Sequence, residues 1–135
     1  ISTILMADFG LELYGNAIIA NTEWATANPD TLKAFLAAVA DGWVDAIANP
    51  EGAVASLIER NPAADAALET RRLQLAIDAN VATDAVMANG MGLVDADRMA
   101  RALGQLAETY EFQNAPDASL SFTDAYLPEG GFALK

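Results

Sequence analysis

The sequence predicts an α/β chain in which two short strands precede four or five helices. Two apolar runs, Ile4-Leu5-Met6 and Ala17-Ile18-Ile19-Ala20, are short, partly β-branched and bounded by polar residues or glycine. These are the features of short buried strands. Beyond them, Asn-Pro pairs recur, and Asn followed by Pro is typical of a helix start. Apolar residues then repeat at helical spacing, which predicts amphipathic helices for the rest of the chain.

The loop between the two predicted strands is the candidate ligand site. Polar, glycine-containing loops between buried strands commonly contact ligands, and this loop contains Asp8, Tyr14, Gly15 and Asn16. Tyr14 either stacks on a ligand ring or holds the loop against the core. Asn16 either binds a polar group of the ligand or stabilises the turn after Gly15. Asp8 either pairs with an amino-bearing ligand or ends its strand.

The Asn-Pro pairs divide the middle of the chain into helices. We expect one helical turn over residues 21–27 and a helix from Asn28-Pro29 to about residue 48. A second helix follows over residues 50–60, and a third, after Asn61-Pro62, over about residues 64–81. The long helix after Asn28 has the clearest apolar face, formed by Leu32, Phe35, Leu36, Val39, Trp43 and Ile47.

The last third of the chain contains one further long helix. The stretch Asn89-Gly90-Met91-Gly92 interrupts any helix before it, and Asp95 is placed to cap the helix that follows. We expect a short terminal helix within residues 121–128 and a loose end after Gly130-Gly131.

Composition excludes several classes of function. The chain has 135 residues, one domain's worth, with 7 basic and 19 acidic residues and a net charge of −12. That charge argues against a nucleic-acid partner, whose phosphates need a basic surface. Because the sequence contains no Cys and no His, it provides no thiol nucleophile, no imidazole base and none of the usual zinc ligands. We therefore expect no metal, no cofactor and no catalysis by this chain.

The predicted strands lack a sheet within this sequence. An isolated pair of strands is marginally stable at best, and a run as apolar as residues 17–20 needs sheet neighbours. We expect residues upstream of Ile1, or another chain, to supply them. The absence of a start Met is compatible with a processed product or a piece of a longer chain.

An ordered series of motifs resembles one family of binding proteins. It begins with Asp8-Phe9-Gly10 and Tyr14-Gly15-Asn16, and it continues through Asn28-Pro29-Asp30, Gly42-Trp43, Asn49-Pro50-Glu51-Gly52 and Phe122-Thr123-Asp124. This combination resembles the C-terminal half of periplasmic solute-binding proteins of ABC importers. The branch is the one that binds thiamine-pyrimidine precursors, sulfonates, taurine and nitrate.

The resemblance implies a periplasmic-binding-protein-like fold with two hinged lobes. Residues 1–21 would form the end of the second lobe and the returning hinge strand, and residues 22–135 the helical C-terminal part of the first lobe. The implied partners are a small-molecule ligand, an ABC permease and the N-terminal half of the same protein. The implied location is the periplasm, or a lipid-anchored extracytoplasmic site.

Two alternatives stay open at this point. One is a pyrimidine-precursor synthase of the same fold, with its histidine and cysteine-rich motif upstream of this chain. The other is a helical protein-interaction module, which would present an exposed apolar patch to its partner.

Overall fold

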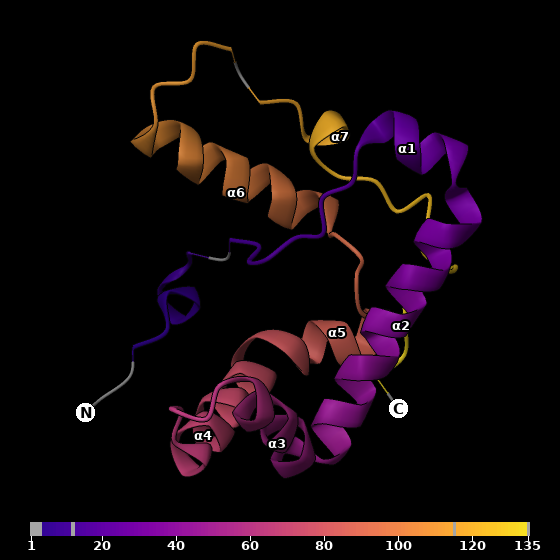
Figure 1. The fold of residues 1–135 in the computed structure, drawn as a ribbon. Helices are drawn as coiled ribbons and strands as arrows, with labels where there is room; N and C mark the ends of the chain where they lie inside the picture. Colours follow the sequence, from indigo (N-terminus) through magenta and orange to yellow (C-terminus); the bar gives the residue numbers. More distant parts are fainter. Residues whose placement is uncertain (1–3, 12, 115, 135) are drawn as a thin grey trace. The chain divides into compact units, whose positions relative to one another are not determined.

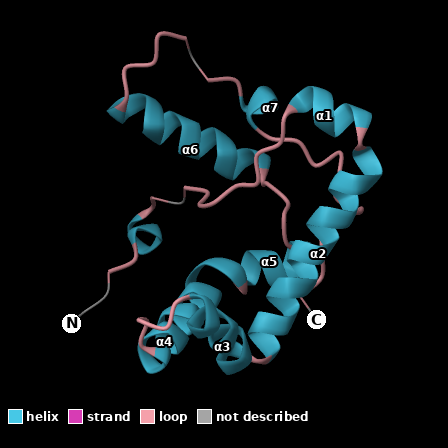
Figure 2. Cartoon of the chain, viewed as in Figure 1, coloured by secondary structure: helices cyan, strands magenta, loops and turns pink. Residues whose placement is uncertain are grey.

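The computed structural model describes residues 4–11, 13–114 and 116–134. Within these residues the chain is helical, and Figure 2 draws no strand. One isolated antiparallel bridge joins Met91 to Phe132. The chain divides into two compact units. The first contains residues 1–19 and 94–125, and the second contains residues 20–93 and 126–135.

The prediction of two strands is wrong for the described residues. The first run enters a 3₁₀ helix, η1 (Met6–Phe9), and the second forms no ladder. Ile19 is 92% exposed. A strand needs a neighbour for its N–H and C=O groups, and the described residues offer this segment none. An apolar run alone therefore did not produce a strand.

The second unit begins with two helices that follow Asn residues (Figure 1). In α1 (Thr22–Ala27), the side chain of Asn21 accepts a hydrogen bond from the Trp24 N–H at 2.9 Å. Helix α2 (Pro29–Ala48) starts at the predicted proline, with Leu32 and Ala40 buried. The predicted bounds of both helices are confirmed, whereas Phe35 of the predicted apolar face is 52% exposed.

Helix α3 (Pro50–Arg60) has the bounds that the sequence predicts. The Asn49 side chain accepts a hydrogen bond from the Gly52 N–H at 3.0 Å, which satisfies one of the free donors of the first turn. Val54 is buried, and α3 contacts both α2 and α4. The α2–α3–α4 layer is thus assembled from neighbouring helices in the sequence.

Helix α4 (Ala66–Ala76) starts later than predicted. Asn61 ends α3 by donating its N–H to the Leu57 carbonyl, and a turn follows in which Ala64 donates to the Asn61 carbonyl at 3.0 Å. Asp65 is the cap instead, since its carboxylate accepts a hydrogen bond from the Leu68 N–H at 2.9 Å. The prediction that Asn61-Pro62 starts this helix is therefore wrong.

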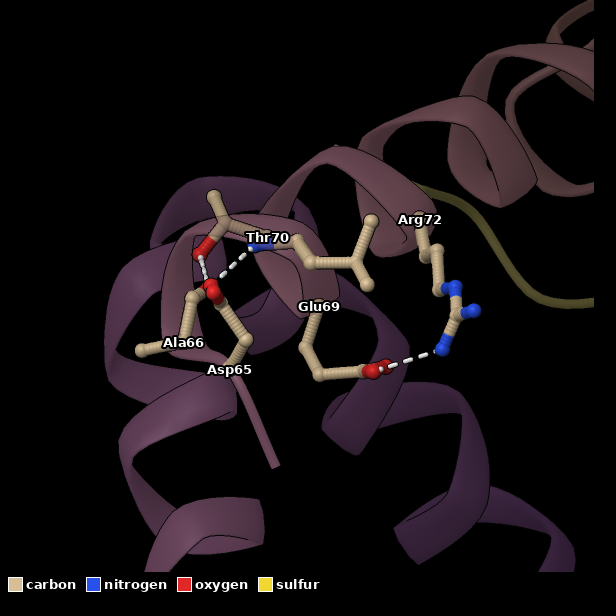
Figure 3. A network of polar contacts seen from close by, with 6 residues as sticks. Asp65, Ala66, Glu69, Thr70 and Arg72 are labelled. Carbon is tan, nitrogen blue, oxygen red and sulfur yellow. Dashed lines mark hydrogen bonds and ion pairs between the residues drawn. The ribbon is translucent and has the colours of Figure 1, made fainter. Parts of the chain in front are cut away.

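The first turns of α4 carry further local contacts, drawn in Figure 3. The Thr70 hydroxyl donates to the Ala66 carbonyl, and Arg72 pairs with Glu69 at 2.7 Å. A π-helical turn, η2 (Ile77–Val81), continues the helix, and Ile77 in it is only 3% exposed.

The end of the second unit is more ordered than predicted. Helix α5 (Asp84–Asn89) stops at Gly90, as the sequence predicts, with a φ of 92°. The N–H of Met91 donates to the Phe132 carbonyl at 2.7 Å, and the N–H of Phe132 donates back at 2.9 Å. The expectation of a loose end is thus wrong for Phe132.

The first unit contains α6 (Ala96–Thr109), whose cap is Asp95 as predicted. Its carboxylate accepts a hydrogen bond from the Arg98 N–H at 2.7 Å. Ala102 is buried, whereas Tyr110, which follows the helix, is exposed and stacks on Phe112 at 6.1 Å between ring centres.

The terminal helix lies earlier than predicted. It is α7 (Ala118–Ser121), and Phe122 is already extended. The proline at position 128 disfavours a helical conformation at Leu127, so it opposes a helix that would run up to it. The Asp117 carboxylate accepts hydrogen bonds from the Ser119 hydroxyl and from the Ser119 N–H. Both bonds lower the pKa of Asp117, and the one from the hydroxyl has the larger effect.

Across the described residues, each helix is too short or too polar to cross a membrane.

Candidate functional site

The candidate loop is fixed at its start by a glycine. Helix η1 ends at Gly10, whose φ of 88° lies in the left-handed region that glycine adopts without strain. The carbonyl of Gly10 accepts a hydrogen bond from the Gln105 side chain of α6 at 2.7 Å. The chain entering the loop is therefore bound to the middle of α6.

Tyr14 connects the loop to the first turn of α6. The Asp95 N–H donates to the Tyr14 hydroxyl at 2.8 Å. The Arg98 guanidinium lies over the Tyr14 ring, 4.3 Å from its centre, where a cation is attracted by the π-electrons. Arg98 also donates to the Leu13 carbonyl at 3.1 Å. Tyr14 is half-buried, and these contacts hold the loop against the helix, which is the structural alternative given for this residue.

Gly15 and Asn16 follow immediately and are exposed. A Cβ on Gly15 would meet nothing within 4 Å. The Asn16 side-chain amide makes no hydrogen bond to any residue that the structure describes. Because Asn16 is exposed, its two N–H donors and its carbonyl acceptor are accessible to a ligand or to water. The rigid Tyr14 anchor thus presents a short accessible segment next to it.

Asp8 lies apart from this arrangement. It is exposed within η1, and no hydrogen bond or ion pair within the described residues joins it to Tyr14 or Asn16. The structure therefore places Tyr14, Gly15 and Asn16 in one segment and does not bring the Asp8 carboxylate to them. Ligand binding by all four residues stays a prediction.

No sequence pattern indicates that Arg98 and Gln105 support this loop. Both residues are more than 80 positions from the groups that they bind. The side-chain oxygen of Gln105 is buried and has no hydrogen-bond partner in the described part of the chain. An unpaired buried acceptor costs about 1–3 kcal/mol, so this oxygen is suited to a donor from water or a ligand.

Two cavities lie in the second unit. The larger, of about 530 Å³, is at the turn between α2 and α3. Its lining consists of small residues with three polar side chains, Asp45, Asn49 and Ser56. The Asn49 oxygen already caps α3. Neither cavity is lined by Asp8, Tyr14, Gly15 or Asn16.

The described residues contain no group of three or more Asp, Glu, His or Cys side chains arranged to hold a metal ion. In the candidate loop the Asn16 amide is accessible, whereas the Arg98 guanidinium already lies over the Tyr14 ring.

Comparison with known proteins relates the first part of the chain to a family. The family model described as "NMT1/THI5 like" matches residues 1–53, a stretch that includes the candidate loop, α1 and α2. This family has a periplasmic-binding-protein-like fold and includes both substrate-binding proteins of ABC importers and THI5 synthases. No curated protein and no solved structure matches the chain. Over its first 53 residues, the chain is similar to the NMT1/THI5-like family.

Proposed function

We propose that the chain is part of the solute-binding component of an ABC import system. The observation that carries the proposal is the NMT1/THI5-like match over residues 1–53, which contains the whole candidate loop. In this proposal the protein acts outside the cytoplasmic membrane, in the periplasm or on a lipid anchor. It captures a small polar ligand, of the pyrimidine type, and delivers it to a permease.

The geometry of the loop supports recognition of a polar heterocycle. Tyr14 is held by Asp95 and Arg98, so the segment after it starts from a fixed position. The amide of Asn16 offers one acceptor and two donors, which complement the ring nitrogen and amino group of an aminopyrimidine. The absence of a side chain at Gly15 allows a ring to approach the backbone.

Ligand capture would follow the hinged closure that is typical of periplasmic binding proteins. In the proposal, residues 1–21 form the end of the second lobe and the returning hinge strand, and residues 22–135 form the helical C-terminal part of the first lobe. The exposed apolar segment at residues 17–20 supports the hinge assignment, because it offers unpaired backbone groups to a neighbouring strand. In the proposal, the N-terminal half of the same protein supplies that strand and the opposite wall of the site.

The test is a titration of the complete protein, which includes the N-terminal half that the proposal invokes, with 4-amino-5-hydroxymethyl-2-methylpyrimidine, and with taurine and nitrate as comparison ligands. Calorimetry gives the dissociation constant, and ¹H–¹⁵N spectra locate the site. We expect 1:1 binding of the pyrimidine and shifts of the Gly15 and Asn16 amides. Asn16→Ala should weaken binding up to about tenfold, the equivalent of one hydrogen bond.

Asn114→Ala is the matched control. Asn114 is exposed in the first unit and, like Asn16, makes no side-chain hydrogen bond to a described residue. Binding should be unchanged in this variant. The proposal would be refuted if none of the three compounds binds, or if both Asn variants weaken binding equally.

A synthase is the second candidate, because the matching family includes THI5 synthases as well. The sequence of the complete gene separates the two functions. A secretion signal would favour the transport protein, whereas a histidine and a cysteine-rich motif upstream of this chain would favour the synthase.

A further inference from the structure

A second, smaller cavity lies between α2 and the C-terminal segment. Its volume is about 290 Å³, and it is lined by Lys33, Tyr126, Leu127, Pro128 and Phe132. Four of these five side chains are apolar or aromatic, and the fifth is a cation. Small-molecule sites are typically apolar and aromatic with a few polar groups that orient the ligand.

The wall of this cavity is held in place by backbone hydrogen bonds. Phe132 exchanges two of them with Met91, at 2.7 and 2.9 Å. The Gly131 N–H donates to the Pro128 carbonyl at 3.0 Å, which closes the turn between the two lining residues. The Phe132 ring and the Pro128 ring are thus attached to a fixed backbone before any ligand arrives.

Glycines make this close approach possible. A Cβ on Gly90 would clash with the Gly130 carbonyl, and a Cβ on Gly131 would lie 2.8 Å from the Met91 carbonyl. Both glycines have positive φ, at 92° and 70°. The C-terminal segment therefore packs against the end of α5 only because side chains are absent at these positions.

Lys33 gives the cavity its electrostatic preference. Within the described residues, the Lys33 ammonium makes no hydrogen bond or ion pair. The chain as a whole carries a net charge of −12, but at physiological ionic strength charges are screened beyond about 8 Å. An anion in the cavity would therefore respond mainly to the nearby charges, which are the Lys33 ammonium and the carboxylates of Asp30, three residues before Lys33 in α2, and of Glu129, next to Pro128.

We propose that this cavity binds a small planar aromatic monoanion. The ring would lie against Tyr126 and Phe132, and the anionic group would pair with the Lys33 ammonium. The cavity has a volume of about 290 Å³ and is open to solvent, so one ring with its carboxylate can enter it while the carboxylate stays near the exposed Lys33. The site is separate from the candidate loop and does not rest on the proposed transport function.

Benzoate is the probe, with benzyl alcohol as a neutral analogue and acetate as an anion without a ring. Each is titrated into the ¹⁵N-labelled chain. We expect saturable shifts of the Lys33, Tyr126 and Phe132 amides with benzoate, and much weaker effects with acetate. Lys33→Gln should raise the benzoate dissociation constant about threefold or more, which is the effect expected for the loss of an exposed ion pair. The same substitution should leave the dissociation constant of benzyl alcohol unchanged.

Arg71→Gln is the matched control, since it removes the same charge from an exposed position in α4. It should leave benzoate binding unchanged. Phe132→Leu keeps the backbone hydrogen bonds and an apolar side chain but removes the ring, and it should weaken both aromatic ligands.

Three results would overturn the inference. They are an absence of saturable shifts at the cavity, an equal effect of Lys33→Gln and Arg71→Gln on benzoate, and benzoate shifts confined to Gly15 and Asn16. The last result would place the anion at the candidate loop, so the two proposals are separately testable.

Discussion

The helices from α1 to α4 and the described residues of the segment before them, 4–11 and 13–20, adjoin in the sequence but depend on different contacts. Each of these helices has its limits set within a few residues, as when Asn49 binds the Gly52 N–H three positions away. The segment before them is held by α6, through hydrogen bonds that join residues 81 and 95 positions apart. Local capping therefore determines the helical region, whereas the candidate loop takes its conformation from a distant helix.

The largest expected contrast between these regions is in apolar burial. Ile77→Ala should lower the free energy of unfolding by about 2–5 kcal/mol, because it leaves a cavity where the side chain is only 3% exposed. Ile19→Ala makes the same chemical change at a side chain that is 92% exposed, and its effect should stay within about 0.5 kcal/mol. Urea denaturation followed by circular dichroism measures both.

Equal losses in the two variants would contradict this contrast. They would mean that Ile19 is buried in the folded protein in solution. A loss at Ile19 that appears only after an added partner chain would instead support the predicted pairing of residues 17–20 with a neighbouring strand.

The next contrast concerns the two candidate caps of α4. Asp65→Ala should cost about 1 kcal/mol, because the Leu68 N–H loses its acceptor. Asn61→Ala should cost much less, since Asn61 contributes its backbone to the end of α3 and the following turn. The free energy of unfolding and helix content of both variants test the assignment, and a larger cost at Asn61 would restore the Asn-Pro pair as the helix start.

Sequence reasoning succeeded where the decisive contacts are local. The starts of α2 and α3 at Pro29 and Pro50, the cap at Asp95 and the break at Gly90 follow from residues within one helical turn. It failed at Asn61 because two acceptable caps stand four residues apart, and only Asp65 accepts a hydrogen bond from the new helix.

The candidate site could be predicted only in part. The sequence pointed to Tyr14 either as a ligand contact or as the residue that holds the loop against the core. It did not show that the partners of Tyr14 lie on α6. Hydrogen bonds from Asp95 and Gln105 to the loop depend on how the chain folds back. The strands at residues 4–6 and 17–20 were predicted from apolar patterning, which cannot report whether a neighbouring strand is present.

The smallest expected effect tests whether α6 does hold the loop. Tyr14→Phe removes the hydroxyl that accepts from the Asp95 N–H at 2.8 Å but keeps the ring under Arg98. It should lower the free energy of unfolding by about 0.5–1 kcal/mol, since water can replace part of this accessible hydrogen bond. Tyr110→Phe is the control, because Tyr110 is 59% exposed and its hydroxyl makes no hydrogen bond to a described residue. Hydrogen exchange of the Asp95 amide gives the direct measurement. Faster exchange in Tyr14→Phe alone would support the anchor, and unchanged exchange would show that the loop and α6 are not joined there in solution.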